Sequence, residues 1–267
     1  MARTNSTGPV LWDVDARGVA SVVLNRPEVN NAYDDDLIQG LLTAMEALAG
    51  ADVLRAIVVK GNGRHFQAGA DLNWIDAVRK SSSQENLRVS RATAEAVQRL
   101  NLAPVPTIGL VHGGCFGGGT GLVAACDVVI AAEDAVFSIA EVRWGLTAAI
   151  ILPQLADAIG VRQLRRYALT GERFGAAEAR RIGLVHEVVP RAGLEAAGER
   201  MLGQLLENGP EAVAETKTLA LRSAFADLDG MTFDRLVGSH AIKRQSAEAA
   251  EGLASFAEKR PARWRPA

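Results

Sequence analysis

The sequence has little cysteine, few aromatic residues and almost no net charge. Its 267 residues include two cysteines, Cys115 and Cys126, too few for the disulfide framework of a small secreted protein. Aromatic residues make up 5% of the chain and the formal net charge is -2, which argues against base-stacking platforms and a basic nucleic-acid surface. We therefore expect a reduced, cytoplasmic protein that binds no nucleic acid.

Metal-ligand spacing and long apolar runs are also missing. The four histidines, His65, His112, His186 and His240, are scattered along the chain and show no metal-like spacing with each other or with the cysteines. No apolar run approaches the roughly 18 residues of a membrane-spanning helix, and the first residues do not resemble a signal or transit peptide. We expect neither a metal site nor a membrane anchor.

The hydrophobic residues, 48% of the chain, follow an alternation of strands and helices. Near-continuous apolar strands that alternate with amphipathic helices predict an α/β fold with a parallel sheet and crossover helices. The first two strands, with turn residues between them, predict a hairpin. Strands are expected at 10–14, 19–24, 54–59, 107–111 and 127–131, and helices at 34–50, 84–102 and 122–125.

The pattern changes after residue 160. Residues 161–182 and 193–258 are helical in pattern, with an apolar segment at 183–190 between them. We interpret residues 1–190 as the α/β core that carries the site. Residues 191–267 are interpreted as a helical region that packs on this core and on neighbouring subunits.

Two glycine-containing loops follow buried strands, at 66–72 and 113–121, and each leads toward a helix. Such loops gather free backbone N–H groups, which suit an anion or a developing oxyanion, although tight packing alone would also explain the glycines. The second loop lacks the Gly-Lys-Ser/Thr of a phosphate P-loop. Neither loop has the G-x-G-x-x-G dinucleotide pattern, so nucleotide binding is not expected.

Several motifs in a fixed order carry a resemblance that spans nearly the whole chain. They are Asn25-Arg26-Pro27 before Asn31-Ala32, the two glycine loops, Cys126-Asp127, Glu141-Val142-Arg143, Leu169-Thr170-Gly171-Glu172-Arg173-Phe174, Glu178-Ala179 before Gly183-Leu184-Val185, and Phe256-Ala257-Glu258-Lys259-Arg260. With these motifs the chain resembles the enoyl-CoA hydratase/isomerase (crotonase) superfamily. The resemblance implies a crotonase (ClpP/crotonase-like) ββα-repeat spiral core with a helical C-terminal trimerisation region.

The resemblance also implies a substrate class and an assembly. It suggests an acyl-CoA thioester substrate, with no separate cofactor because coenzyme A is part of the substrate. It further suggests a homo-oligomer, either a trimer or a dimer of trimers. Because this fold hosts many acyl-CoA reactions, the resemblance is specific for the superfamily and not for one reaction.

Site residues follow from the resemblance by motif position. The backbone N–H groups of Ala70 and Gly118 would polarise the thioester carbonyl and stabilise an enolate-like oxyanion. Lys259 resembles a lysine that reaches the CoA phosphate, sometimes from another subunit, although an ordinary solvated lysine fits equally well. The remaining CoA contacts would come from Arg26, Val29, Ala68, Asp71 and Leu72, together with the two oxyanion residues.

The acid/base residues depart from the usual hydratase pattern. Typical hydratases hold a water with two glutamates, and the first of these positions is Gly121 here. The second position is Glu141. An isolated glutamate is usually a surface charge, but this one lies among apolar residues, and we expect a partly apolar setting to raise its pKa. Glu141 is therefore the predicted catalytic acid/base.

The segment 147–152 also differs from the glycine-rich stretch of many hydratases. We expect the bulky pair Ile150–Ile151 to fill the space that the missing first glutamate leaves. This loop and the glycine loop resemble a subgroup associated with branched glutaconyl-type (methylglutaconyl or isohexenylglutaconyl-like) CoA esters. A basic residue would then bind the distal carboxylate, with Arg64, Arg79 and Arg143 as unranked candidates.

Other polar and aromatic residues have simpler interpretations. Cys115 with His112 as its base could form a nucleophile pair, but a small buried cysteine beneath the glycine loop explains the residue better. His186 is predicted to be structural. Phe137 and Trp144 are expected in the pocket wall or the core.

The leading functional hypothesis is an enoyl-CoA hydratase, a lyase that adds water across the α,β double bond of an acyl-CoA thioester. An enoyl-CoA isomerase or an acyl-CoA decarboxylase of the same fold is the alternative enzyme, because one acid suffices to move a proton at an enolate. A non-catalytic CoA-ester-binding or RNA-binding protein is the alternative from another class. The missing first glutamate favours the last hypothesis slightly, whereas the acidic pI opposes RNA binding.

Overall fold

Two β-sheets organise the part of the chain that the computed structural model describes, residues 4–51, 53–223 and 246–265. The six-stranded sheet has the order β1-β2-β3-β4-β6-β9, with β1 antiparallel to β2 and the other neighbours parallel. The three-stranded sheet has the order β5-β7-β8. The strands are β1 Val10–Val14, β2 Val19–Leu24, β3 Ala56–Gly61, β4 Thr107–Val111, β5 Gly114–Phe116, β6 Val128–Ala132, β7 Val136–Ser138, β8 Phe174–Gly175 and β9 Glu187–Val189.

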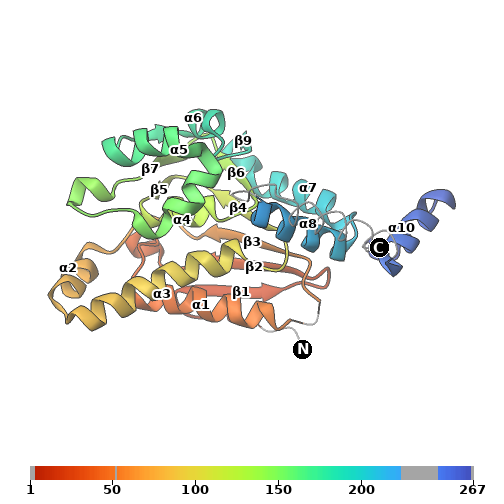
Figure 1. Cartoon of the computed structure of the whole chain (residues 1–267), viewed down its shortest axis with the longest axis horizontal. Helices are drawn as coiled ribbons and strands as arrows, with labels where there is room; N and C mark the ends of the chain where they lie inside the picture. The colour runs from red at the N-terminus through yellow and green to blue at the C-terminus, as the bar shows by residue number, and fades with distance from the viewer. Residues whose placement is uncertain (1–3, 52, 224–245, 266–267) are drawn as a thin grey trace, which may run out of the picture.

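Helices cover both faces of the large sheet (Figure 1). One face packs against α1 and α3 in the larger hydrophobic core, and the opposite face packs against α7 in a second core. The α-helices are α1 Asp35–Ala49, α2 Leu72–Lys80, α3 Ser83–Asn101, α4 Gly118–Ala124, α5 Leu152–Thr170, α6 Ala176–Ile182, α7 Leu194–Leu206, α8 Pro210–Ser223 and α10 Ala247–Ala257. Short 3-10 helices are η1 Pro27–Val29, η2 Glu141–Trp144, η3 Ala149–Ile151 and η4 Arg191–Gly193.

Successive turns of the chain repeat one pattern: a strand in the large sheet, a strand in the small sheet, then a helix. The units β4-β5-α4 and β6-β7-α5 follow it fully. Among the described residues, the turn β3-α2 has no second strand, but Gln67, which lies between β3 and α2, forms an isolated parallel bridge with Cys115 of β5. This arrangement is the ββα-repeat spiral that the resemblance implied. It brings the loop after each large-sheet strand to the same side of the molecule.

The first predicted elements are confirmed. β1 and β2 form an antiparallel hairpin in which Val10 pairs with Leu24, and the turn between them is closed by a backbone hydrogen bond from Gly18 to Asp15. The side chain of Asp34 accepts a hydrogen bond from the amide of Leu37 at 3.0 Å and caps α1. Local signals set both elements, because apolar spacing and caps act over a few residues.

The continuous helical pattern predicted over 161–182 is wrong in its middle. α5 ends at Thr170, where Gly171 adopts a left-handed φ of 59°, and β8 and α6 follow. A second glycine, Gly160 with φ 70°, breaks α5 internally. Apolar periodicity does not report such breaks, since glycine accepts positive φ without the cost that a Cβ imposes. Helix α4 also begins earlier than expected, at Gly118 instead of Leu122.

The C-terminal region packs partly on the sheet of the core. β9 ends at Val189, near the expected boundary, and the side chains of α7 that reach the sheet include Leu194, Leu202 and Leu206. The helical pattern expected over 193–258 corresponds to α7, α8 and α10, and its residues 224–245, which include His240, lie outside the described residues. Throughout the described ranges, no helix is long and apolar enough to cross a bilayer. The domain division and the cytoplasmic location stay predictions.

The buried side chain of Asn31 links the loop after β2 to the loop after β3. It is 0% exposed, and its Nδ2 donates to the carbonyl oxygens of Asn62 and His65, both at 2.9 Å, and of Phe66 at 3.2 Å. Its Oδ1 accepts a hydrogen bond from the amide of Arg26 at 2.8 Å. One amide side chain therefore contacts four backbone groups, and its two N–H protons are shared among the three carbonyls.

We predict that Asn31→Ala lowers the free energy of unfolding by about 3 kcal/mol, because it leaves several enclosed backbone groups without hydrogen-bond partners. Urea unfolding measures the change. Asn73→Ala is the matched control: Asn73 is exposed on α2, so its loss should stay within about 0.5 kcal/mol. Equal losses for the two variants would contradict the role of Asn31.

Candidate active site

A cavity of about 340 Å³ opens where α1, α2, α3 and α4 meet the segment 146–151. Its lining is mostly aliphatic, and Glu141 is the one carboxylate among the lining residues. The lining consists of Tyr33, Leu37, Ile38, Leu41, Gln67, Trp74, Ile75, Val78, Asn86, Val89, Ser90, Thr93, Ala96, Val97, Gly118, Leu122, Glu141, Leu146, Thr147, Ala148, Ala149, Ile150 and Ile151.

The two glycine loops lie side by side next to this cavity. The amide of Gln67 donates to the carbonyl of Gly114 at 3.1 Å, and the amide of Phe116 donates back to the carbonyl of Gln67 at 2.9 Å. A Cβ on Gly117 would lie 3.8 Å from the Cα of Gly69. Because both loops follow parallel strands of one sheet, their approach is a direct consequence of the fold.

The amides of Ala70 and Gly118 are available to a ligand. Neither donates a hydrogen bond to any other residue that the structure describes, although most enclosed backbone N–H groups in proteins are paired. Gly118 is the first residue of α4, where an amide has no partner within the helix. Gly118 lines the cavity. Ala70 is outside the lining and joins the site as the parallel bridge partner of Tyr33.

The carboxyl group of Glu141 faces the same place. Glu141 begins η2, and its Oε1 would lie 3.2 Å from a Cβ on Gly117. Its Oε2 is buried and has no hydrogen-bond partner among the described residues. Burial raises the pKa of Glu141, an effect that a hydrogen bond from its own backbone amide partly opposes. The expected direction of the pKa shift is confirmed.

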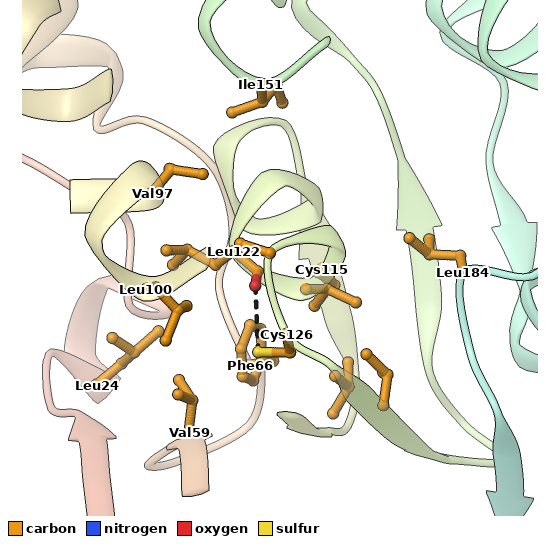
Figure 2. Packing of buried hydrophobic residues seen from close by; sticks show 14 of the residues in the cluster. Leu24, Val59, Phe66, Val97, Leu100, Cys115, Leu122, Cys126, Ile151 and Leu184 are labelled. Atoms are coloured by element: carbon orange, nitrogen blue, oxygen red, sulfur yellow. Dashed lines mark hydrogen bonds between the residues drawn. The ribbon is translucent and has the colours of Figure 1, made fainter. Parts of the chain in front are cut away.

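The space next to Gly121 is filled by Ile151, as the sequence predicted. A Cβ on Gly121 would lie 2.3 Å from Cγ2 and 2.7 Å from Cβ of Ile151, so no side chain fits there. Ile151 is 1% exposed and sits over α4 (Figure 2). Its neighbour Ile150 is 37% exposed and contributes to the cavity wall. Ile151 therefore takes up the space that a side chain at position 121 would need.

Two polar residues at the site were missed in the sequence analysis. Gln67 is 0% exposed, and its side chain accepts from the amide of Gly69 at 2.9 Å and donates to the Gly69 carbonyl at 3.1 Å. Tyr33 lines the cavity next to Gly118. The sequence offered one signal for each: Gln67 lies inside the first glycine loop, and Tyr33 directly follows the Asn31-Ala32 motif.

The residues predicted to contact CoA lie on adjoining segments. The Arg26 guanidinium pairs with Asp34 at 2.8 Å and donates to the Ala32 carbonyl at 2.5 Å, so its head group is already bound within the chain. The Asp71 carboxylate accepts from the first amides of α2 as its N-cap. Leu72 is 54% exposed and open to a ligand. The CoA contacts predicted for these residues, and for Val29 and Ala68, stay predictions.

Lys259 is not brought to the cavity within one chain. It follows α10, which lies at the opposite end of the molecule from α2, and Lys259 is not among the residues that line the cavity (Figure 1). The contact between Lys259 and CoA, from the same chain or from a neighbouring one, stays a prediction. The trimer or dimer of trimers likewise concerns contacts between copies and stays a prediction.

None of the three candidate arginines for a distal carboxylate lines the cavity. Arg64 lies in a separate surface pocket beside Gly113. Arg79 pairs with Asp76 on the exposed side of α2 at 2.7 Å. The Arg143 Nε donates to the carbonyl of Gly171 at 2.8 Å. Arg79 and Arg143 therefore make contacts outside the cavity, Arg64 lies in another pocket, and the described lining contains no cation.

The simpler interpretation of the cysteine is supported. Cys115 is 0% exposed, burial raises its pKa well above the ordinary value, and it packs in the core (Figure 2). The ring of His112 contacts the carbonyl of Gly63 at 3.1 Å instead. His186 is structural, since its Nδ1 accepts from the amide of Val129 at 3.0 Å. Trp144 was expected in the pocket wall or the core but is 63% exposed, because η2 turns it to the surface.

Known proteins resemble this chain over most of its length. The family model for enoyl-CoA hydratase/isomerase matches residues 15–266. A hydroxycinnamoyl-CoA hydratase-lyase of Pseudomonas fluorescens is 34% identical over 205 residues, which are 75% of this chain and 74% of that protein. A mitochondrial Delta(3,5)-Delta(2,4)-dienoyl-CoA isomerase of Dictyostelium discoideum is 31% identical over 260 residues, 92% of this chain and 87% of that protein. The crystal structure of an enoyl-CoA hydratase from Shewanella pealeana matches with a TM-score of 0.92 and 35% identity, covering 97% of each chain.

The raised pKa of Glu141 predicts a pH-dependent stability. The folded protein holds the Glu141 proton to a higher pH than the unfolded chain does. The contribution of Glu141 to stability therefore falls as the pH rises above 4.5, the ordinary pKa of a glutamate. We expect Glu141→Gln to melt above the wild type at about pH 8, with a difference that shrinks toward acid. Glu46→Gln, which removes one exposed carboxyl group from α1, is the matched control. A pH-independent difference for Glu141→Gln would contradict the assignment.

The contact between Gly121 and Ile151 predicts coupled substitutions. Gly121→Ala alone should cost about 1–3 kcal/mol by overpacking, and Ile151→Ala alone should destabilise by opening a cavity. In the double variant the alanine at 121 no longer meets Ile151, so its additional cost should shrink by about 1 kcal/mol or more. Urea unfolding of the four proteins measures this coupling, and additive losses would show that the two positions are independent.

Proposed function

The chain belongs to the enoyl-CoA hydratase/isomerase family, and from that premise we propose that it adds water across the α,β double bond of an acyl-CoA thioester. The observation that carries the proposal is the buried, unpartnered Oε2 of Glu141 in the cavity that the unpaired amide of Gly118 also lines. A carboxyl group and hydrogen-bond donors on one cavity provide the two elements that hydration requires.

In this proposal the thioester oxygen lies against the amides of Ala70 and Gly118. These donors withdraw electron density from the carbonyl and make the β-carbon of the enoyl group electrophilic. The Glu141 carboxylate takes a proton from water as the water oxygen bonds to the β-carbon. The electron pair of the double bond moves to form an enolate, and Glu141 then returns a proton to the α-carbon. One carboxyl group serves both steps, since Ile151 occupies the position next to Gly121.

The lining favours an uncharged acyl group. Aliphatic side chains from α1, α2 and α3 surround the cavity, and their burial against a hydrocarbon chain is favourable. A branched glutaconyl-type ester would bring a second carboxylate into this lining, where Arg64, Arg79 and Arg143 are absent. The cost of burying an unpaired charge supports the uncharged ester over the glutaconyl type.

Isomerisation is the second candidate reaction, and the single carboxylate of the lining favours it. Glu141 would remove a proton from one carbon and return it to another, with the same enolate held by the two amides. This reaction needs no bound water. The two candidates therefore differ in the mass of the product and share every site residue.

The test is incubation with matched esters, crotonyl-CoA against glutaconyl-CoA and 3-methylcrotonyl-CoA against 3-methylglutaconyl-CoA, and with the unconjugated 3-butenoyl-CoA, followed by product mass and by the absorbance of the conjugated thioester. We expect a gain of one water and a higher kcat/KM for the uncharged member of each pair. Unchanged mass with a shifted double bond would select isomerisation, and loss of carbon dioxide would select decarboxylation. Binding without turnover of any ester would overturn the enzymatic proposal.

Glu141→Ala should lower kcat by about a hundredfold or more, because proton transfer requires the carboxyl group. Binding of CoA esters should change little, since the variant removes no backbone donor. Glu46→Ala, which removes an exposed carboxyl from α1, is the matched control and should keep full activity. More than about a tenth of the wild-type kcat in Glu141→Ala would contradict the one-carboxyl mechanism.

A further inference from the structure

The ring of Tyr33 packs directly against the amide-bearing residue Gly118. A Cβ on Gly118 would lie 2.7 Å from Cε1, 3.3 Å from Cζ and 3.4 Å from the hydroxyl oxygen of Tyr33. The phenol hydroxyl is therefore within a few ångströms of the first residue of α4. This approach also explains why position 118 holds a glycine, because any side chain there would displace the ring.

The orientation of Tyr33 is fixed by its backbone and by its neighbours. Its amide donates to the carbonyl of Gly69, and its carbonyl accepts from the amide of Asp71, both at 2.9 Å. The ring also contacts Trp74 edge-on, with centroids 5.6 Å apart and an interplanar angle of 74°. Trp74 is itself held by a hydrogen bond from its Nε1 to Asp35 at 3.0 Å. The hydroxyl is thus held in place before any ligand binds.

The hydroxyl of Tyr33 has no hydrogen-bond partner among the described residues, although the residue lines the cavity. Burial, together with the negative charge of Glu141, raises the pKa of Tyr33 to about 12. The group therefore keeps its proton at neutral pH and can act as a donor. The hydroxyl is not among the fully buried polar atoms, so a ligand in the cavity can reach it and accept its hydrogen bond.

We propose that the Tyr33 hydroxyl is a third hydrogen-bond donor to the thioester oxygen of bound acyl-CoA, next to the amides of Gly118 and Ala70. The inference rests on the proposed function, because it assumes that the thioester lies against these amides. No proton is transferred in this role. The hydrogen bond strengthens as negative charge develops on the oxygen, so its main effect falls on the enolate and less on the substrate.

The test compares Tyr33→Phe, which keeps the ring, with Tyr167→Phe, a matched control. Tyr167 is the other tyrosine of the chain, and its hydroxyl binds Glu178 near α6, outside the cavity. Acetoacetyl-CoA is the probe, since its bound enolate is followed by near-ultraviolet absorbance across a pH series without any turnover. This readout reports the stabilisation of an enolate whether the enzyme hydrates or isomerises its substrate.

We expect the wild type to lower the apparent pKa of bound acetoacetyl-CoA below its value in water. Tyr33→Phe should raise that pKa by about one to two units, which is a tenfold to hundredfold weaker enolate stabilisation. With the substrate found in the product-mass test, kcat should fall by a similar factor while KM stays within about threefold. Tyr167→Phe should change neither quantity.

Two outcomes overturn the inference. A Tyr33→Phe variant with unchanged enolate pKa and unchanged kcat would show that the hydroxyl does not reach the thioester oxygen. A changed KM with an unchanged enolate pKa would assign the hydroxyl to substrate binding alone. A wild type that does not bind acetoacetyl-CoA would instead overturn the proposed function, so the two failures are distinguishable.

Discussion

Three chain segments joined by backbone hydrogen bonds, residues 30–33, 66–71 and 114–118, determine the positions of most groups at the site. The carbonyl of Asn30 accepts from the amide of Ala68, and Tyr33 bonds with its own amide and carbonyl to the same loop. That loop in turn pairs with β5 through Gln67. These hydrogen bonds leave the amides of Ala70 and Gly118 unpaired, whereas the neighbouring backbone amides of Gln67, Gly69 and Asp71 are all hydrogen-bonded. The rest of the site depends on this three-segment clamp, because a shift of one segment would move both amides and the tyrosine.

The glycines of the loop before and within α4 are explained mainly by close contacts. Each of four lacks a Cβ at a point where a side chain from elsewhere in the chain approaches. The pairs are Gly117 with Glu141 at 3.2 Å, Gly118 with Tyr33 at 2.7 Å, Gly119 with Gln67 at 2.5 Å and Gly121 with Ile151 at 2.3 Å, measured from the position that a Cβ would take. The side chains of Glu141, Tyr33, Gln67 and Ile151 therefore all reach the first turn of α4 or the residue before it. The glycines thus allow these side chains to pack closely against α4. Among the four, only Gly117 has a positive φ, of 50°, which a residue with a Cβ rarely adopts.

Sequence reasoning succeeded where the determining signals are local or where a motif fixes a position. The hairpin, the helix at 34–50, the raised pKa of Glu141 and the filling of the space next to Gly121 by the Ile150–Ile151 segment were predicted and are confirmed, the last through Ile151. Tyr33 was missed because its role depends on a contact with Gly118, 85 positions along the chain, that no periodicity reports. The candidate arginines failed for the same reason, since sequence proximity to the site does not say which way a side chain points.

The apolar surroundings of Glu141 suit a carboxyl group that must act alone. The ionised form leaves Oε2 buried without a partner, so uptake of a proton removes an unfavourable charge from the cavity. In the proposed hydration this makes Glu141 a stronger base toward water. The same preference makes the return of the proton to the α-carbon harder, and hydrogen-bond donors that stabilise the enolate add to this difficulty because they lower the basicity of the enolate. A one-carboxyl site therefore works when the basicity of Glu141 and that of the bound enolate are matched, and the donors at the thioester oxygen set the second of these.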